Sequence, residues 1–201
     1  MNIKEIFNYR YACKEFDTSK KIEQNIVDDI LLSGNLSPSS FGLEPWRFIV
    51  IKKDEVKEKL FEASYYQKQV KECDFVIAII ARVDFEKDDS YIDECAKRLS
   101  ENNEQFAKVC RSFFAHQTKD GIISWANRQC FIAGANMMSV GAIHKVDSCP
   151  MEGFVPAKVH EILKLKEKEF ASLLIPFGYR ADTSSLRAKV RWKLDEMVQY
   201  I

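Results

Sequence analysis

Long apolar runs constrain the fold of this chain more than any other feature of its sequence. The run from Phe75 to Val83 is almost continuously apolar, and a second run, from Trp46 to Ile51, is bounded by Pro45 and Lys52. A strand that is apolar on both faces must be covered on both faces. We therefore predict that both runs are inner strands of a sheet, with a third buried strand from Phe170 to Phe177.

Helical periodicity fills the segments around these strands, so helices and strands alternate. Apolar residues at helical spacing predict a helix over residues 22–31 that Gly34 ends with a left-handed cap. The segment 124–143 is rich in Ala, Gly and Met on almost every side, which predicts a helix buried all round, as in a dimer core. Further helices are predicted over residues 56–64, 91–116 and 155–163.

The charge balance excludes several classes of partner. The 201 residues include 30 basic and 30 acidic side chains, so no net charge draws the chain to nucleic acid or to an anionic membrane. Residues 1–5 are charged where a signal peptide would be apolar, and no uncharged apolar run reaches membrane-spanning length. We expect one cytoplasmic domain over residues 1–201 that binds neither nucleic acid nor membrane.

Six cysteines raise the question of a metal or redox site. None forms a Cys-x-x-Cys pair, and the three histidines lie at no ligand spacing from them. We therefore expect no metal site and interpret the thiols as small buried core residues. Cys13 is singled out because Arg10 and Lys14 flank it and could lower its pKa, although packing is the preferred interpretation there too.

The glycine pattern disfavours one common way of binding a nucleotide. The chain has seven glycines and no Gly-x-Gly-x-x-Gly or Walker motif, so a Rossmann-type phosphate site is not expected. Side-chain cations are the alternative, and Arg10, Lys189 and Arg191 have the required chemistry. Taken alone, these three residues would be interpreted as solvated surface charges.

Four short motifs in a fixed order change that interpretation. Arg10-x-x-x-Lys14 is followed by a Ser-Pro-Ser-Ser turn at 37–40 that leads into Pro-Trp, then by a Glu-Gly pair at 152–153, and finally by Lys189-x-Arg191. Each motif is weak, but together they resemble the nitroreductase family of FMN-dependent, NAD(P)H-oxidising enzymes over nearly the whole chain. The resemblance implies an α+β, three-layer fold with a mainly antiparallel central sheet flanked by helices, and a homodimer with FMN at the subunit interface.

The resemblance also implies how FMN is held. It places five residues at the phosphate and ribityl chain: Arg10, Tyr11, Ala12, Lys189 and Arg191. Lys14 would approach the N1 and C2 carbonyl edge of the flavin ring, where a cation stabilises the negative charge that reduction brings. Ala12 stands where the family usually has a small hydroxyl residue, so one side-chain hydrogen bond would be missing.

Other parts of the ring are assigned in the same way. The loop Pro38, Ser39 and Ser40 would come from the second subunit, although the same residues also suit a simple turn. Tyr66, Gln67 and Gln69 would lie at the pyrimidine edge, and Tyr66 departs from the asparagine that is common there. Pro150, Met151, Glu152 and Gly153 would pass the ring edge, with the Glu152–Gly153 backbone N–H groups aimed at N5 and glycine permitting the close approach. Phe41 and Phe114 would line the substrate pocket.

The implied chemistry needs no catalytic acid, base or nucleophile from the protein, because FMN carries it. NADH or NADPH would deliver hydride, and an electron-poor acceptor such as a nitroaromatic or a quinone would then take the same place, in a ping-pong mechanism. Two alternatives remain open. One is another flavin reaction on the same fold, such as azoline dehydrogenation, dehalogenation or flavin destruction; the other is a non-enzymatic flavin-binding or flavin-free dimer, which the departures at Ala12 and Tyr66 would suit.

Overall fold

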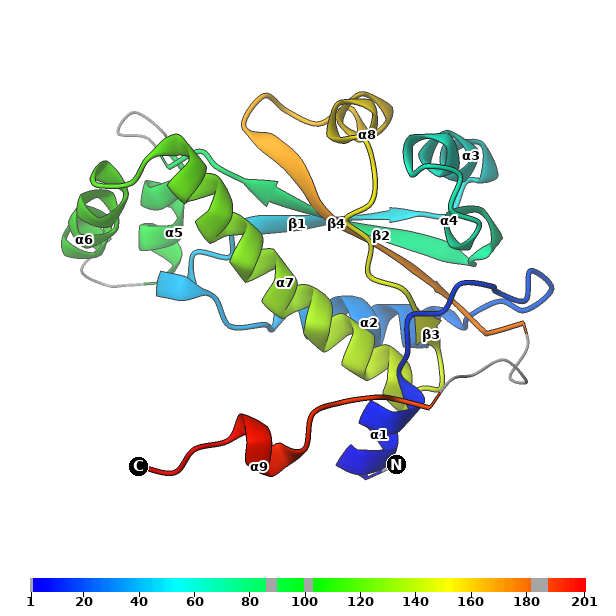
Figure 1. The fold of residues 1–201 in the computed structure, drawn as a ribbon. Coiled ribbons are helices and arrows are strands. Elements are labelled where there is room, and N and C mark those ends of the chain that lie inside the picture. The colour runs from blue at the N-terminus through cyan, green and yellow to red at the C-terminus, as the bar shows by residue number, and fades with distance from the viewer. Residues whose placement is uncertain (1, 86–89, 100–102, 182–187) are drawn as a thin grey trace.

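The computed structural model describes residues 2–85, 90–99, 103–181 and 188–201 (Figure 1). Its helices are α1 (Ile3–Tyr9), α2 (Gln24–Asn35), α3 (Asp54–Ala63), α4 (Gln69–Glu72), α5 (Tyr91–Leu99), α6 (Asn103–Ala115), α7 (Lys119–Ile143), α8 (Pro156–Leu163) and α9 (Leu194–Met197), with a short 3₁₀ helix, η1 (Ser40–Gly42). Its strands are β1 (Trp46–Ile51), β2 (Phe75–Arg82), β3 (Asp147–Ser148) and β4 (Glu169–Gly178).

An antiparallel sheet of order β1-β2-β4-β3 forms the middle layer of the molecule. Strand β2 is buried along almost its whole length, as its continuous apolar run predicts. Its side chains alternate between two cores: Phe75, Ile77 and Ile79 belong to one, and Val76, Ala78 and Ile80 belong to the other.

Helices cover both faces of the sheet, so the α+β, three-layer expectation is confirmed. The long helix α7 crosses one face with α2 beside it and with α5 and α6 at one end, while α3, α4 and α8 lie on the other face (Figure 1). This arrangement places β3 and the N-terminal segment at one end of α7, and η1 at the other end, beside α5 and α6 (Figure 1).

Three local expectations were wrong. Strand β1 lies at the edge of the sheet, with β2 as its partner within the described residues, and not inside it. Gly34 lies within α2 and is not a left-handed cap; a Cβ atom there would lie 2.0 Å from Met137 Cε on α7, so glycine permits the close contact of the two helices. The stripe predicted over residues 91–116 is two helices, α5 and α6, and the junction at 100–102 lies outside the described residues.

Helix α7 is longer than predicted, and the single chain does not cover all of its faces. Ile132 and Ile143 are 39% and 49% exposed, and Ala135 is exposed between them, so one face of the helix is open to solvent in the single chain. These residues follow one another at spacings of three and eight along the helix, and therefore share one apolar face.

A paired charge across the sheet gives a test of stability. Arg47 Nε and Nη2 donate to the two carboxylate oxygens of Glu169 at 2.8 and 2.7 Å, and these bonds lower the pKa of Glu169 from 4.5 to about 2. Because the pKa of this carboxyl group is lower in the folded than in the unfolded protein, its ionised form stabilises the fold at pH values above the unfolded pKa. This stabilisation is lost as the pH falls towards 2. We expect Glu169→Gln to reduce the free energy of unfolding by about 1–2 kcal/mol at pH 7, a value reduced because Arg47 is partly exposed, and by much less near pH 2. Urea unfolding at both pH values measures this; an equal loss at both would contradict it.

Candidate functional site

The N-terminal segment after α1 runs extended beside β3 and the end of β4. Ala12 forms a bridge with Ser148, and Cys13 N donates to the Ser148 carbonyl at 3.1 Å. Phe16 forms a second bridge, with Arg180, which lies two residues beyond the end of β4. These backbone bonds bring the Arg10-x-x-x-Lys14 motif next to the segment that leads from β3 to Gly153.

The structure joins several of the predicted ring-edge residues in one cluster. Lys14 Nζ lies 3.2 Å from the sulfur of Cys149, immediately before Pro150. Gln69 Nε2 donates to Gln67 Oε1 at 3.0 Å, and Gln67 Nε2 donates to the Gly153 carbonyl at 2.9 Å. Lysine, two amides and the Glu-Gly segment, which are far apart in sequence, thus lie together.

The Glu-Gly segment presents free donors to solvent. Met151 is fixed to β4 by reciprocal backbone bonds with Leu174, at 2.8 and 3.1 Å, whereas Glu152 and Gly153 are exposed. Within the described part of the chain, the backbone N–H groups of Glu152 and Gly153 donate no hydrogen bond. Exposed, unpaired N–H groups on a fixed loop suit an acceptor atom on a ligand.

Tyr66 does not join this cluster. Its ring packs edge to face on Phe61, with the centroids 5.4 Å apart, and the side chain of Tyr66 is exposed. Both Tyr65 and Tyr66 have positive φ, at 54° and 57°, a backbone conformation that residues other than glycine rarely adopt. This tight turn directs Gln67 towards Gly153 and leaves Tyr66 facing α3.

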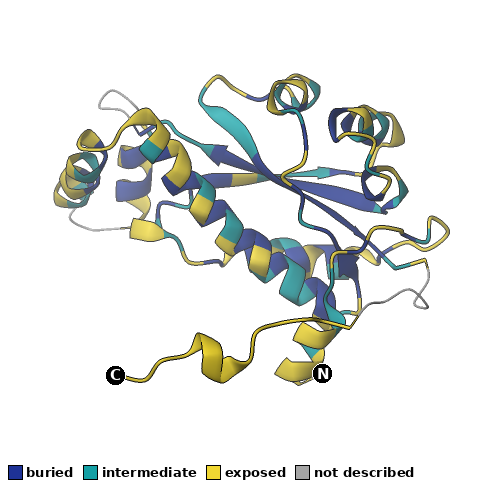
Figure 2. Ribbon diagram, in the orientation of Figure 1, coloured by how far each residue is buried: buried dark blue, intermediate teal, exposed yellow. Residues whose placement is uncertain are grey.

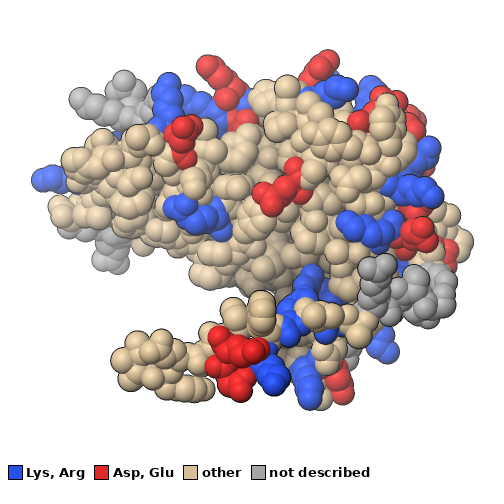
Figure 3. Space-filling model, viewed as in Figure 1, with Lys and Arg blue, Asp and Glu red and all other residues tan. Residues whose placement is uncertain are grey.

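The two ends of the chain bring three cations together. Lys189 Nζ donates to the Phe7 carbonyl in α1, and the pKa of Lys189 is lowered by burial and by the nearby charges of Arg10 and Arg191. None of the three forms an ion pair with a carboxylate among the described residues. Figure 3 shows basic side chains gathered beside α1, where the C-terminal segment leaves the body. Cations that no carboxylate among the described residues pairs with suit an anionic ligand.

The Ser-Pro-Ser-Ser loop is attached to a different part of the molecule. Ser40 N donates to Gln129 Oε1 on α7 at 2.9 Å, and Ser39 Oγ accepts from Glu44 N at 2.9 Å. The ring of Phe41 meets that of Phe113 on α6, with the centroids 5.3 Å apart. Asn136 Nδ2, also on α7, donates to Ser37 Oγ at 2.8 Å, so this loop lies beside the middle of α7, whereas Lys14 contacts Cys149 after β3.

Comparison with known proteins identifies the family. The model of the nitroreductase family matches residues 8–179. The chain belongs to the nitroreductase family. A Staphylococcus haemolyticus protein with the name of an NAD(P)H nitroreductase is 37% identical over 97% of this chain and 95% of its own length, and a Bacillus subtilis protein with the same kind of name is 34% identical over 99% and 97%.

Solved structures agree with the nitroreductase fold. A Bacillus subtilis protein described as a nitroreductase superposes with a TM-score of 0.87 at 22% identity, over 98% of both chains. An Exiguobacterium sibiricum protein of the same description, solved in complex with FMN, superposes with a TM-score of 0.83 at 21% identity, over 100% of this chain and 98% of that one.

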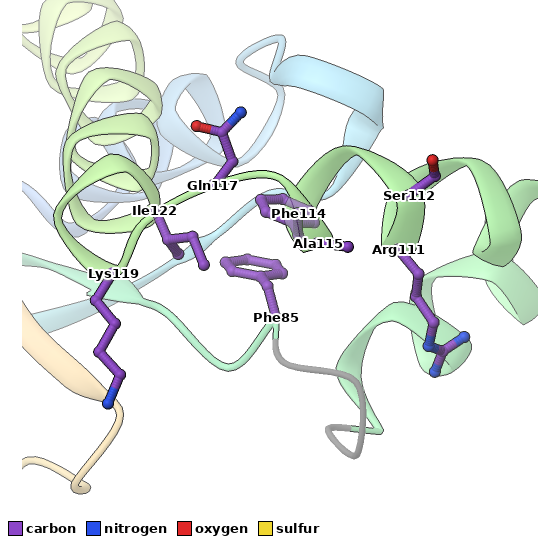
Figure 4. Close-up of a pocket in the computed structure, with 8 residues that line it drawn as sticks. All are labelled: Phe85, Arg111, Ser112, Phe114, Ala115, Gln117, Lys119 and Ile122. Carbon is purple, nitrogen blue, oxygen red and sulfur yellow. The ribbon is translucent and has the colours of Figure 1, made fainter.

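Phe114 has a different environment from the one predicted for a substrate-lining residue of a nitroreductase. It is 3% exposed, stacks on Phe85 with the ring centroids 4.5 Å apart, and meets Trp125 edge to face. With Ile122 and other residues it lines a cavity of about 490 Å³ between α6 and α7 (Figure 4). Neighbouring residues on a helix point about 100° apart, so Phe113 and not Phe114 faces Phe41. The substrate role of Phe114 stays a prediction.

The six cysteines are buried and free, as predicted for core residues. Burial raises the pKa of Cys13, whose sulfur accepts a hydrogen bond from Tyr11 Oη at 3.5 Å, so its flanking cations do not make it a reactive thiolate. No group of residues that could hold a metal ion occurs in the described ranges. None of the helices there has the length and apolar character needed to cross a membrane.

Proposed function

We propose that this chain is an FMN-dependent oxidoreductase that uses NADH or NADPH as hydride donor. The observation that carries the proposal is the meeting of Arg10, Lys189 and Arg191 without a carboxylate partner. Two guanidinium groups and one ammonium group are suited to a phosphate dianion, and the FMN-bound neighbour and the names of the relatives support that choice of ligand. Tyr11 and Ala12 follow Arg10 directly and would line the path of the ribityl chain.

The second cluster would hold the flavin ring. When bound, FMN would supply the hydride-transfer chemistry that the side chains of this protein do not provide. Lys14 would place its ammonium at the N1 edge, where it stabilises negative charge. Gln67 and Gln69 would contact the pyrimidine edge, and the free N–H groups of Glu152 and Gly153 would point at N5. Tyr66, turned towards Phe61, would contribute at most at the outer rim.

The nicotinamide and an electron-poor acceptor, such as a nitroaromatic or a quinone, would bind one after the other on the same face of the flavin ring. Such alternate binding at one place would make the mechanism ping-pong. The exposed ring of Phe41 and its neighbour Phe113 supply an aromatic surface for such an acceptor. No proton donor or nucleophile is required from the protein in this mechanism, and its specificity would depend on the shape of this aromatic surface. Another flavin reaction on the same fold stays the alternative.

Assembly as a homodimer would complete the site. The surfaces that expose large apolar side chains include the face of α7 with Ile132 and Ile143 and the C-terminal segment 188–201, whose Trp192 and Leu194 are 76% and 77% exposed (Figure 2). In their own chain Ser40 contacts α7 and Phe41 contacts α6, whereas Lys14 contacts Cys149 after β3, so we expect the loop Pro38–Ser40 and Phe41 to reach the ring of the partner's FMN. We place residues 1–201 in one domain and, as the sequence predicts, in the cytoplasm.

A homodimer that depends on these surfaces predicts a clear hydrodynamic result. We expect sedimentation of the purified protein to give twice the chain mass of 23.3 kDa at micromolar concentration. Replacing Ile132 and Ile143 together by Asp should give monomers and loss of FMN, because charges would be buried against the partner. A stable monomer with bound, reducible FMN would contradict the dimer.

The proposed function is tested on the purified holoprotein. We expect one FMN per chain, released on denaturation, and recovery of the yellow colour when the apoprotein is mixed with FMN. The reduced protein, mixed without oxygen with a nitroaromatic or a quinone, should regain the oxidised flavin spectrum. A colourless protein that FMN cannot reconstitute would favour a non-enzymatic dimer, and reconstitution without transfer to any acceptor of these classes would favour another flavin reaction.

A further inference from the structure

We propose that Arg180 is a positioning residue that fixes Arg10 in place for the phosphate, an inference that rests on the proposed FMN site. Arg180 lies just beyond the end of β4 and, in the described structure, is held by Asp147, Tyr9 and Tyr11. Arg180 is also a cation, but it does not belong to the group of Arg10, Lys189 and Arg191, which we call the phosphate cluster.

The ion pair of Arg180 with Asp147 is nearly buried. The exposed fractions of the two side chains are 12% and 1%. Arg180 Nε donates to Asp147 Oδ2 at 2.9 Å, Nη2 donates to Oδ1, and the backbone N–H of Arg180 adds a third bond at 3.1 Å to Oδ2. A two-point guanidinium-carboxylate contact fixes the plane of the guanidinium, and here β3 supplies the carboxylate that fixes it.

That fixed plane lies against the residues on both sides of Arg10. The guanidinium carbon is 4.3 Å from the ring centroid of Tyr9 and 4.7 Å from that of Tyr11. Arg180 Nη2 also donates to the carbonyl oxygen of Tyr9 at 3.3 Å, and that carbonyl carbon is bonded to the nitrogen of Arg10. Tyr9 Oη donates to the Lys145 carbonyl at 2.6 Å and lies 3.2 Å from Asp147 Oδ2, so the whole group is connected.

The consequence is that the backbone of Arg10 has little freedom. Tyr9 ends α1 and Tyr11 begins the extended segment, so Arg10 occupies the corner between them, and its N–H donates to the Ile6 carbonyl as the helix cap. Because Asp147 already neutralises Arg180, Arg180 adds little charge at the phosphate. Arg180 contributes by fixing the backbone of Arg10, so that the Arg10 side chain lies near Lys189 and Arg191.

The substitution Arg180→Lys tests this role because it separates the charge of Arg180 from its geometry. Lys keeps the charge opposite Asp147 but lacks the planar fork, so it cannot pair with Asp147 at two points, stack on two rings and reach the Tyr9 carbonyl together. We expect Arg180→Lys to weaken FMN binding about tenfold while riboflavin binding changes less than twofold, since the loss concerns the phosphate. The matched control is Arg47→Lys, which alters a comparable two-point pair with Glu169 away from the phosphate cluster and should leave the affinity ratio of FMN to riboflavin unchanged.

The measurement is fluorescence titration of the apoprotein dimer with FMN and with riboflavin, with circular dichroism as the test of folding. If wild type binds both flavins equally, the proposed phosphate site fails, whatever Arg180 does. If wild type prefers FMN and Arg180→Lys keeps that full preference, or loses both flavins in the same proportion, Arg180 is not a positioning residue for Arg10.

A second pair of variants keeps the test decisive if Arg180→Lys does not fold. Tyr9→Phe retains the ring under Arg180 and should change the FMN preference little. Tyr9→Leu removes the ring and should lower the preference several-fold. Equal preference in the two variants would contradict the proposal.

Discussion

Replacing Arg10 or Arg191 by alanine is expected to weaken FMN binding by about tenfold to a hundredfold. Each substitution removes a charge-assisted contact to the phosphate, worth roughly 1.5 to 3 kcal/mol. The structure strengthens this expectation, because Arg10 and Arg191 both lie close enough to lower the pKa of Lys189 and no carboxylate among the described residues competes for them. Isothermal titration of the apoprotein with FMN measures the change.

Riboflavin is the control for this prediction, since it has the same ring and no phosphate. It should bind wild type weakly and should be nearly indifferent to both substitutions. Lys158→Ala, which removes an exposed positive charge on α8, should leave both affinities as they are. If the two arginine variants lose riboflavin and FMN equally, these residues support the fold and do not recognise the phosphate.

Lys14→Met is expected to lower the reduction potential of bound FMN and to slow its reduction by NAD(P)H. Methionine keeps most of the volume and removes the cation at the N1 edge. Loss of an interaction of about 1.4 kcal/mol would lower a two-electron potential by about 30 mV. FMN affinity should change much less, because the phosphate cluster is untouched. Cys149 helps to define this site, since its sulfur lies 3.2 Å from the Lys14 ammonium.

The potential is measured by equilibration with a reference dye, and the rate by stopped-flow mixing with NADH and NADPH. Lys158→Met serves as the control for a lysine lost elsewhere on the surface. An unchanged potential in Lys14→Met would mean that Lys14 does not reach the pyrimidine edge, and Gln67 and Gln69 would then have to be reconsidered too.

The sequence predicts the layers of this fold better than its edges. Continuous apolar runs identify β2 and β4 because each face of these strands is buried in the chain itself. The same pattern makes β1 look internal, although it lies at the edge of the sheet. The composition of residues 124–143 predicts a helix that one small domain cannot fully cover, and the face of α7 with Ile132 and Ile143 is open in the single chain.

The candidate site divides in a similar way. Motifs identify Arg10, Lys14 and Lys189 because their order along the chain is characteristic, and the structure brings the first and last together. No motif identifies Arg180 or Asp147, since an arginine after a strand and an aspartate 33 positions earlier carry no local pattern. The choice between Phe113 and Phe114 depends on the rotation of α6 about its axis. The sequence of two adjacent phenylalanines does not predict which of them faces Phe41.

Anaerobic titration of the holoprotein with NADH and with NADPH tests the central claim most directly. The account predicts that the yellow protein bleaches fully after one equivalent of at least one donor per bound FMN, and that an electron-poor acceptor then restores the colour. Bound FMN that neither nicotinamide reduces, or a protein that takes up no FMN at all, would contradict it.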